Sequence, residues 1–184
     1  DSTKLMTAQT FITKARNAVN HKTLYVMGAI GQPLNASNKA FLVNHCAWYN
    51  GQPDRVAKIN AASSDTFGFD CVCLVKSILW GWNGNVNAVY GGAAYASNGV
   101  PDLGTEGFLN HCGQSYTNFS NIPAGAYLWM QGHAGIYIGD GLAIECTPQW
   151  SDGAQITAVG NIGPVSGYNT RYWTRWARIP YIQY

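Results

Sequence analysis

The sequence is poor in charge and has no long apolar run. Asp, Glu, Lys and Arg make up 11% of its 184 residues, where an ordinary soluble domain has about 25%. The net charge of +2 argues against nucleic acid as the main partner. Arg171, Arg175 and Arg178 gather near the C-terminus, where we expect them on a solvated strand face. No apolar run approaches the roughly 20 residues of a membrane span, so we expect none.

The five cysteines follow no disulfide or zinc pattern. Their number is odd and no CxxC spacing occurs. We therefore expect free thiols in a chain made in a reducing compartment, with no metal and no cofactor; the alternative is a Cys46–Cys112 disulfide. The chain begins at Asp1 without a methionine and shows no signal peptide, so we expect a processed or trimmed chain.

Glycine and aromatic residues are abundant, with 21 Gly, 11 Tyr and 7 Trp, and the length suits one domain over residues 1–184. Apolar periodicity predicts helices first and strands afterwards, which is typical of an α+β fold with an antiparallel sheet. The expected helices are 7–20 (capped by Thr7), 38–49, 54–62, 70–80 and 105–111. The expected strands are 126–130, 134–138, 142–146, 155–159 and 173–182. Residues 83–101 are expected to form a long structured loop.

Cys71 stands at the start of the expected apolar helix, directly after Asp70, a residue suited to cap it. Free amides at a helix N-terminus favour a thiolate and can hold an oxyanion. Taken alone, Cys71 is more simply explained as a buried structural cysteine. Cys73 is a rival nucleophile, but two residues apart on a helix the two thiols point in different directions.

His133 opens a strand of alternating small and large residues, and Gly139-Asp140-Gly141 predicts a tight hairpin after it. The returning strand carries Glu145, a charge in an apolar run, which is costly unless paired. A cross-strand imidazole would pair it and would be oriented by it. The simpler alternatives are a surface histidine and an outward-facing carboxylate.

These segments together resemble the NlpC/P60 cysteine peptidases. Phe69-Asp70-Cys71, followed by Leu74-Val75, resembles the family's cysteine motif, and Gly132-His133 through Gly141 resembles its histidine strand. Glu145 falls where the family places its third polar residue. Residues 122–129 resemble the strand entry, and Tyr25-Val26-Met27-Gly28 resembles the upstream tyrosine motif. The resemblance covers mainly residues 24–28 and 67–147.

The sequence departs from the family in four places. Val72-Cys73 replaces Ser-Gly, which keeps Cys73 open as the nucleophile. Glu145 replaces His, Asn or Gln, and Ala126 stands where Asp is common. An insertion at about 29–66 separates the tyrosine and cysteine motifs, and with residues 81–121 we expect it to build walls of the substrate cleft.

The resemblance implies a papain-like fold with the cysteine helix packed on an antiparallel sheet. It implies a peptidoglycan hydrolase that cuts stem peptides between D-glutamate and the diamino acid through a thioester. The implied catalytic residues are Cys71, His133 and Glu145, and the implied substrate contacts are Tyr25 and Asp70. We expect a monomeric phage-type endolysin domain that acts at the bacterial cell wall, made without a signal peptide or secreted with the signal removed.

Other functions remain open on the same residues. A CHAP-type amidase, which cuts between muramic acid and L-alanine, and an acyltransferase would use the same three side chains. A wall-binding module without catalysis is the alternative from another class, with tryptophans as sugar platforms. An intact cysteine, histidine and acid set argues against lost catalysis.

Overall fold

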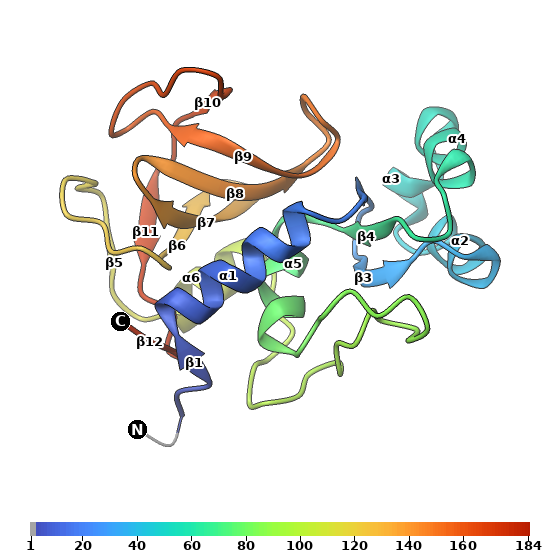
Figure 1. The fold of residues 1–184 in the computed structure, drawn as a ribbon, viewed down its shortest axis with the longest axis horizontal. Helices are drawn as coiled ribbons and strands as arrows, with labels where there is room; N and C mark the ends of the chain where they lie inside the picture. The colour runs from blue at the N-terminus through green and yellow to red at the C-terminus, as the bar shows by residue number, and fades with distance from the viewer. Residues whose placement is uncertain (1–2) are drawn as a thin grey trace.

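The computed structural model describes residues 3–184 as a mixed fold of helices and sheets, shown in Figure 1. Its largest sheet has seven strands in the order β10-β9-β8-β7-β6-β11-β5. Neighbouring strands are antiparallel, apart from the parallel pair β9 and β10. The strands are β5 Ser115–Tyr116, β6 Tyr127–Met130, β7 His133–Gly139, β8 Leu142–Thr147, β9 Gly153–Val159, β10 Thr170–Arg171 and β11 Arg175–Ala177.

The β7–β8 hairpin forms at the predicted turn. Gly139, Asp140 and Gly141 have φ values of 91°, 56° and 75°, a left-handed conformation that glycine and aspartate tolerate better than most residues. The recorded pairing of β7 with β8 runs from the turn back to Ile136 and Ile144. His133, the first residue of β7, therefore lies outside the part of β7 that pairs with β8.

Helix α5, Cys71–Leu79, lies at the centre of the fold, as Figure 1 shows. Asp70 caps it by accepting a hydrogen bond from the backbone of Cys73. All nine of its residues are buried, including Lys76, whose ammonium is paired with Asp102. It packs against β7, β8 and α1, Ala8–Val19. Thr7 caps α1 as predicted. The large sheet thus places the start of α5 beside the start of β7.

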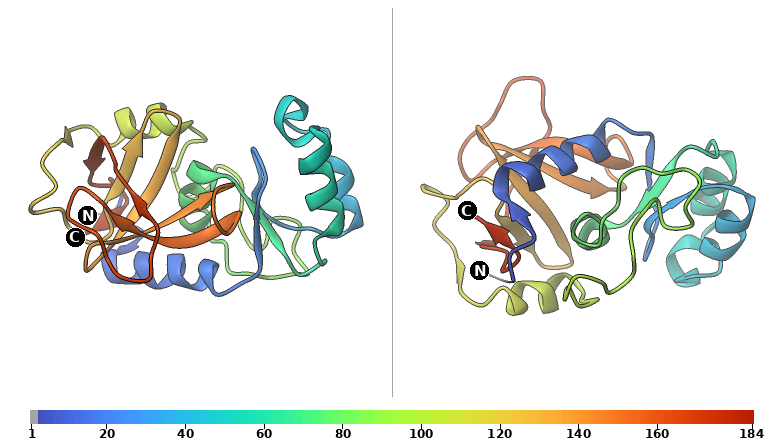
Figure 2. Two further views of the ribbon diagram at one scale, coloured as in Figure 1. Left: turned by 90° about the horizontal axis from the view of Figure 1, so that it is seen from above. Right: turned by 60° about the horizontal axis from the view of Figure 1, so that its bottom comes forward.

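The inserted segment extends a second, smaller sheet. This sheet has the order β2-β4-β3 and consists of β2 Thr23–Tyr25, β3 Ile30–Pro33 and β4 Phe67–Phe69. Three helices follow β3: α2 Ala36–Leu42, α3 Ala47–Asn50 and α4 Pro53–Ala61. Figures 1 and 2 show these helices at the end of the molecule away from the seven-stranded sheet. They have their own buried cluster, which includes Leu34, Leu42 and Ile59.

The remaining elements are α6, Thr105–His111, and a two-stranded parallel pair of β1, Met6–Thr7, and β12, Ile182–Gln183. Residues 80–104 contain neither helix nor strand, as predicted for 83–101. They are anchored to the core by Trp80, whose indole N–H donates to the Val100 carbonyl at 2.9 Å. None of the helices in residues 3–184 has the length and apolar character that a membrane crossing needs.

Two predicted elements are wrong in extent. The expected helix 38–49 is two helices, because Cys46 adopts a left-handed conformation with φ 52° between them. The expected strand 173–182 is interrupted: β11 ends at Ala177, and β12 joins a different sheet. Pro180 lies in the gap and has no N–H to donate to a strand ladder.

Candidate active site

Cys71 is the first residue of α5 and is 5% exposed. The N-terminus of α5 is fixed by Asp70, whose two carboxylate oxygens accept hydrogen bonds from the backbone amides of Cys73 and Gly28, each at 2.8 Å. Backbone amides of Ala134, Val72 and Cys71 itself favour the Cys71 thiolate. Since Ala134 directly follows His133, the structure brings the thiol to the start of the histidine strand.

The charge balance at Cys71 differs from the one predicted. Burial and, to a smaller degree, the adjacent Asp70 carboxylate raise the pKa of the Cys71 thiol to about 12, because the three backbone amides offset only part of their effect. The helix N-terminus therefore does not by itself make a resting thiolate. A nearby base has to take the proton when the thiol reacts.

Cys73 faces a different part of the molecule. Cys73 lines a cavity together with residues of the insertion and of the loop over residues 80–104. Cys71 does not line this cavity. Burial raises the pKa of Cys73 well above its usual value, and the Asp70 carboxylate adds to the effect. The two thiols diverge as helix geometry predicts, and it is Cys71 that receives the amide of Ala134.

His133 and Glu145 form the hydrogen bond expected from the hairpin. His133 Nε2 lies 2.8 Å from Glu145 Oε1, and the Glu145 side chain is fully buried. An ionised carboxylate can only accept, so Nε2 carries the proton of this bond. Nδ1 is then the ring nitrogen left to exchange a proton with another group.

Glu145 also bonds to two residues that the sequence did not indicate. Arg171 Nε donates to Oε1 at 2.7 Å, and Thr157 Oγ1 donates to Oε2 at 2.7 Å. Burial alone raises the pKa of Glu145, but the hydrogen bond and charge of His133, the charge of Arg171 and the Thr157 hydroxyl outweigh it, so the net pKa is lowered. Glu145 is therefore a buried anion with two partners of positive or potentially positive charge.

The prediction of a solvated strand face is wrong for Arg171, whose side chain is 12% exposed. Its guanidinium carbon lies 5.0 Å from the Trp150 ring centre and 5.9 Å from that of Trp173. Trp173 in turn stacks on His133, with ring centres 5.3 Å apart and 10° between the planes. His133 is thus held at its edge by Glu145 and on its face by Trp173.

Tyr25, a predicted substrate contact, lies close to Cys71 and Asp70. Burial raises its pKa above the usual range, and negative charge at Cys71 and at Asp70 raises it further. Its ring meets that of Tyr49 edge-on at 5.7 Å, and its carbonyl accepts a hydrogen bond from Arg55. Tyr25, Asp70 and Cys71 therefore come together, although 45 residues of sequence separate Tyr25 from Asp70.

All five cysteines, which fall within the described residues 3–184, are free. The alternative of a Cys46–Cys112 disulfide is therefore wrong. Within the same part of the chain, no three His, Cys, Asp or Glu side chains are grouped so as to hold a metal ion.

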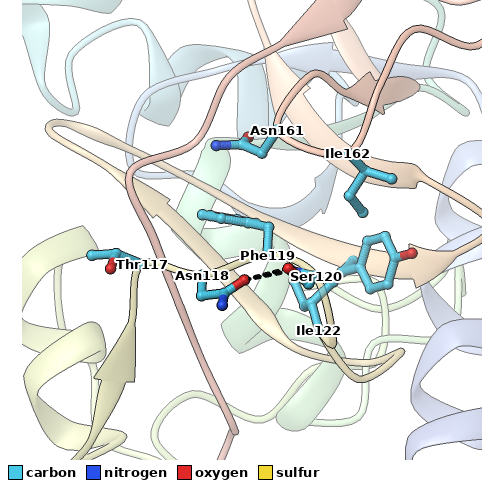
Figure 3. Close-up of a pocket in the computed structure, with 8 residues that line it drawn as sticks. Thr117, Asn118, Phe119, Ser120, Ile122, Asn161 and Ile162 are labelled. Carbon is cyan, nitrogen blue, oxygen red and sulfur yellow. Dashed lines mark hydrogen bonds between the residues drawn. The ribbon is translucent and has the colours of Figure 1, made fainter.

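Figure 3 shows a second cavity, of about 520 Å³, near the far end of β7. Asn118 within it accepts a hydrogen bond from the Ser120 hydroxyl at 2.6 Å. The eight residues that line it are Thr117, Asn118, Phe119, Ser120, Ile122, Tyr137, Asn161 and Ile162. Because none is a cysteine, a histidine or a charged residue, this cavity has no nucleophile and base pair.

The raised pKa of Cys71 predicts slow alkylation that accelerates with pH. Below a pKa of about 12 the thiol is mostly protonated, so in His133→Ala the rate with iodoacetamide should rise about tenfold per pH unit from pH 7 to 10, without a plateau. Peptide-resolved mass spectrometry measures this at Cys71 alone. The control is the protein unfolded in guanidinium, where the rate should level off near the ordinary cysteine pKa of about 8.5. A plateau below pH 9 in folded His133→Ala would contradict the prediction.

Comparison with solved structures finds similar chains, and one of them is a peptidoglycan hydrolase. No protein-family model matches the chain, and no curated protein sequence matches it. The structure is similar to that of RipB, a peptidoglycan hydrolase from Mycobacterium tuberculosis. The TM-score is 0.43 and the sequence identity 16%, over 96% of this chain and 67% of the RipB chain.

Proposed function

We propose that the protein is a peptidoglycan hydrolase of the cysteine endopeptidase type, with Cys71 as nucleophile, His133 as base and Glu145 as the residue that orients the imidazole. The observation that carries this is the position of Cys71: its thiol meets the amide that follows His133, and His133 is held by a buried carboxylate. The nucleophile is then next to the base, and the base is next to the group that orients it, as in other covalent hydrolases.

The reaction proceeds by acyl transfer. His133 Nδ1 takes the Cys71 proton as the sulfur attacks the amide carbonyl, and amides at the N-terminus of α5 hold the oxyanion. Collapse breaks the C–N bond, and the imidazolium gives its proton to the leaving amine. Water, deprotonated by His133, then cleaves the thioester and frees the thiol. Glu145 stabilises the imidazolium in each step.

The raised pKa of Cys71 suits this sequence of steps. Burial keeps the thiol protonated at rest, so the proton moves to His133 as the substrate is attacked and not before. Glu145 is ionised because Arg171 and Thr157 bind its two oxygens, so the carboxylate can stabilise the developing imidazolium without taking its proton.

The arrangement we propose is papain-like and comprises one catalytic domain over residues 1–184, with an insertion at about 29–66. Its support is the packing of α5 on β7 and β8 and a main buried cluster that runs from Phe11 to Ile182. We further propose a monomeric endolysin-type domain that acts on the cell wall, with no nucleic-acid partner. Tyr25 and Asp70, which lie beside Cys71, are the proposed contacts to the stem peptide.

The bond proposed for cleavage lies between D-glutamate and the diamino acid. Digestion of purified peptidoglycan followed by labelling of new amino termini tests this, and the label is expected on the diamino acid. Label on L-alanine would instead identify an amidase, and transfer to an acceptor other than water an acyltransferase. The absence of any new amine would contradict the hydrolase and favour a wall-binding module.

A further inference from the structure

A cavity of about 620 Å³ lies beside α5 on the side of Cys73. It is lined by residues of the insertion, of α5 and of the loop over residues 80–104, together with Gly28 and Asp70. Asp70, which directly precedes Cys71, is one of its lining residues, so the cavity reaches the end of α5 that carries the proposed nucleophile. We call it the Gln32 cavity.

The walls of the Gln32 cavity are tied to one another by hydrogen bonds. Asn38 of α2 donates to the Val89 carbonyl of the loop at 3.2 Å. Lys76 of α5 is buried and donates to Asp102 at 2.5 Å and to the Leu103 carbonyl at 2.7 Å. These contacts join all three segments, so the cavity exists before any ligand arrives.

Gln32 brings an unused donor to this cavity. Its side chain is 4% exposed, and its Oε1 accepts the backbone N–H of Ile30 at 2.7 Å. That bond fixes which end of the amide is oxygen. Among residues 3–184, no side chain or carbonyl accepts a hydrogen bond from the NH₂ group of Gln32, which lines the cavity. The NH₂ group is therefore free to donate to an oxygen of a ligand in the cavity.

A β-bulge places Gln32 there. The register of β3 with β4 shifts between Ile30 and Pro33, and Gly31 has φ 95°. A Cβ on Gly31 would lie 2.2 Å from Trp82, whose indole N–H donates to the Gly31 carbonyl at 3.0 Å. Bulges of this kind re-aim a side chain beside functional sites. Here the bulge directs the Gln32 side chain toward the cavity, and the hydrogen bond from Trp82 to Gly31 stabilises the bulge.

The charges of the cavity favour a neutral ligand group. Asp70 and Asp102 line it, and within residues 3–184 Asp70 binds only backbone amides and the Cys73 side chain. The ammonium of Lys76 is already paired with Asp102, and His45 lies at the exposed rim. A second carboxylate would meet negative charge, whereas a carboxamide or peptide carbonyl would accept from Gln32 without that penalty.

We propose that the Gln32 cavity is a substrate subsite that selects amidated over free-acid stem peptides, with a carbonyl oxygen of the peptide accepting from Gln32. The inference rests on the proposed function, because it takes the ligand of this cavity to be the peptide that Cys71 attacks. Gln32 is then a specificity residue supplied by the insertion.

The test is calorimetric binding of two synthetic tetrapeptides, L-Ala-D-isoglutamine-L-Lys-D-Ala and its D-glutamate form, to Cys71→Ala at pH 8. We expect the amidated peptide to bind at least fivefold more tightly. Gln32→Glu keeps the acceptor for Ile30 and removes the donor, so it should weaken binding of the amidated peptide about tenfold. Gln32→Met removes the donor without adding charge, and with it the acceptor for Ile30, and should weaken binding about fivefold. Gln9→Leu, on the exposed face of α1, is the matched control and should bind as the parent does.

Hydrolysis of peptidoglycan by the same variants with Cys71 restored separates the two proposals. A raised KM with unchanged kcat in both Gln32 variants supports the subsite. Hydrolysis with unchanged KM in both variants, or equal binding of the two peptides, overturns the subsite and leaves the proposed function standing. A native chain that does not hydrolyse peptidoglycan overturns the proposed function and the subsite with it.

Discussion

Cys71→Ala is expected to abolish peptidoglycan hydrolysis, with a loss of at least about 10³-fold, the scale seen when a covalent nucleophile is removed. The thiol forms the bond to the acyl group, and no neighbouring side chain can replace it at the N-terminus of α5. Release of dye from labelled cell walls measures the rate. Thermal unfolding should show that the variant is folded, because alanine is a good helix former and removes only one sulfur atom.

Cys73→Ala is the matched control. It deletes the same atom from the same helix, but on the side that lines the Gln32 cavity. Its hydrolysis should stay within a few-fold of the parent. Survival of activity in Cys71→Ala together with its loss in Cys73→Ala would make Cys73 the nucleophile. If neither substitution changes the rate, the protein is not a cysteine hydrolase.

Arg171→Met is expected to have the second largest effect, a loss of about 3–5 kcal/mol in the free energy of unfolding, because it leaves a buried carboxylate short of a partner. Glu145 is fully buried and receives the Arg171 Nε–H at 2.7 Å. Without this charge the pKa of Glu145 rises. Urea unfolding at pH 4 to 8 measures the change, and Arg178→Met, an exposed arginine against Trp176, is the control and should change little.

The pH dependence follows from the lowered pKa of Glu145. A carboxylate whose folded pKa lies below its unfolded pKa stabilises the fold above the unfolded value, and this contribution is lost as pH falls through the folded pKa. Arg171→Met raises the folded pKa, so the acid loss of stability and of activity should begin at a higher pH. If the stability and activity of the variant fell at the same acid pH as those of the parent, the role of Arg171 would be contradicted.

A double-mutant cycle then shows whether Arg171 acts through Glu145. If it does, adding Arg171→Met to Glu145→Gln should reduce kcat no further than Glu145→Gln alone. A further large loss of kcat in the double variant would show that Arg171 contacts the substrate directly.

Local patterns in the sequence were enough to predict the elements that carry the site. Asp70 before an apolar run predicts a capped, buried helix, and Gly139-Asp140-Gly141 predicts a hairpin that returns Glu145 toward His133. Both depend on interactions between residues near one another in the chain. The short helices 54–62 and 105–111 were likewise predicted to within a residue or two of α4 and α6.

Contacts between residues far apart in the chain could not be predicted from such local patterns. Arg171 lies 26 residues from Glu145, and no periodicity in a charge-poor segment marks it as a buried partner. The strand predicted at 173–182 failed for a related reason: which sheet a short segment joins depends on what else covers that sheet, and β12 pairs with β1.

The sequence by itself determined the helix that presents a cysteine and the hairpin that joins a histidine to an acid, since caps, turns and alternation act over a few residues. Only the tertiary structure decided that Cys71 and not Cys73 meets the histidine strand, that Arg171 holds the acid, and that Gln32 enters a cavity. The last depends on Trp82, 51 residues from Gly31. Such contacts follow from how the sheets and helices pack in three dimensions, which the order of residues along the chain does not display.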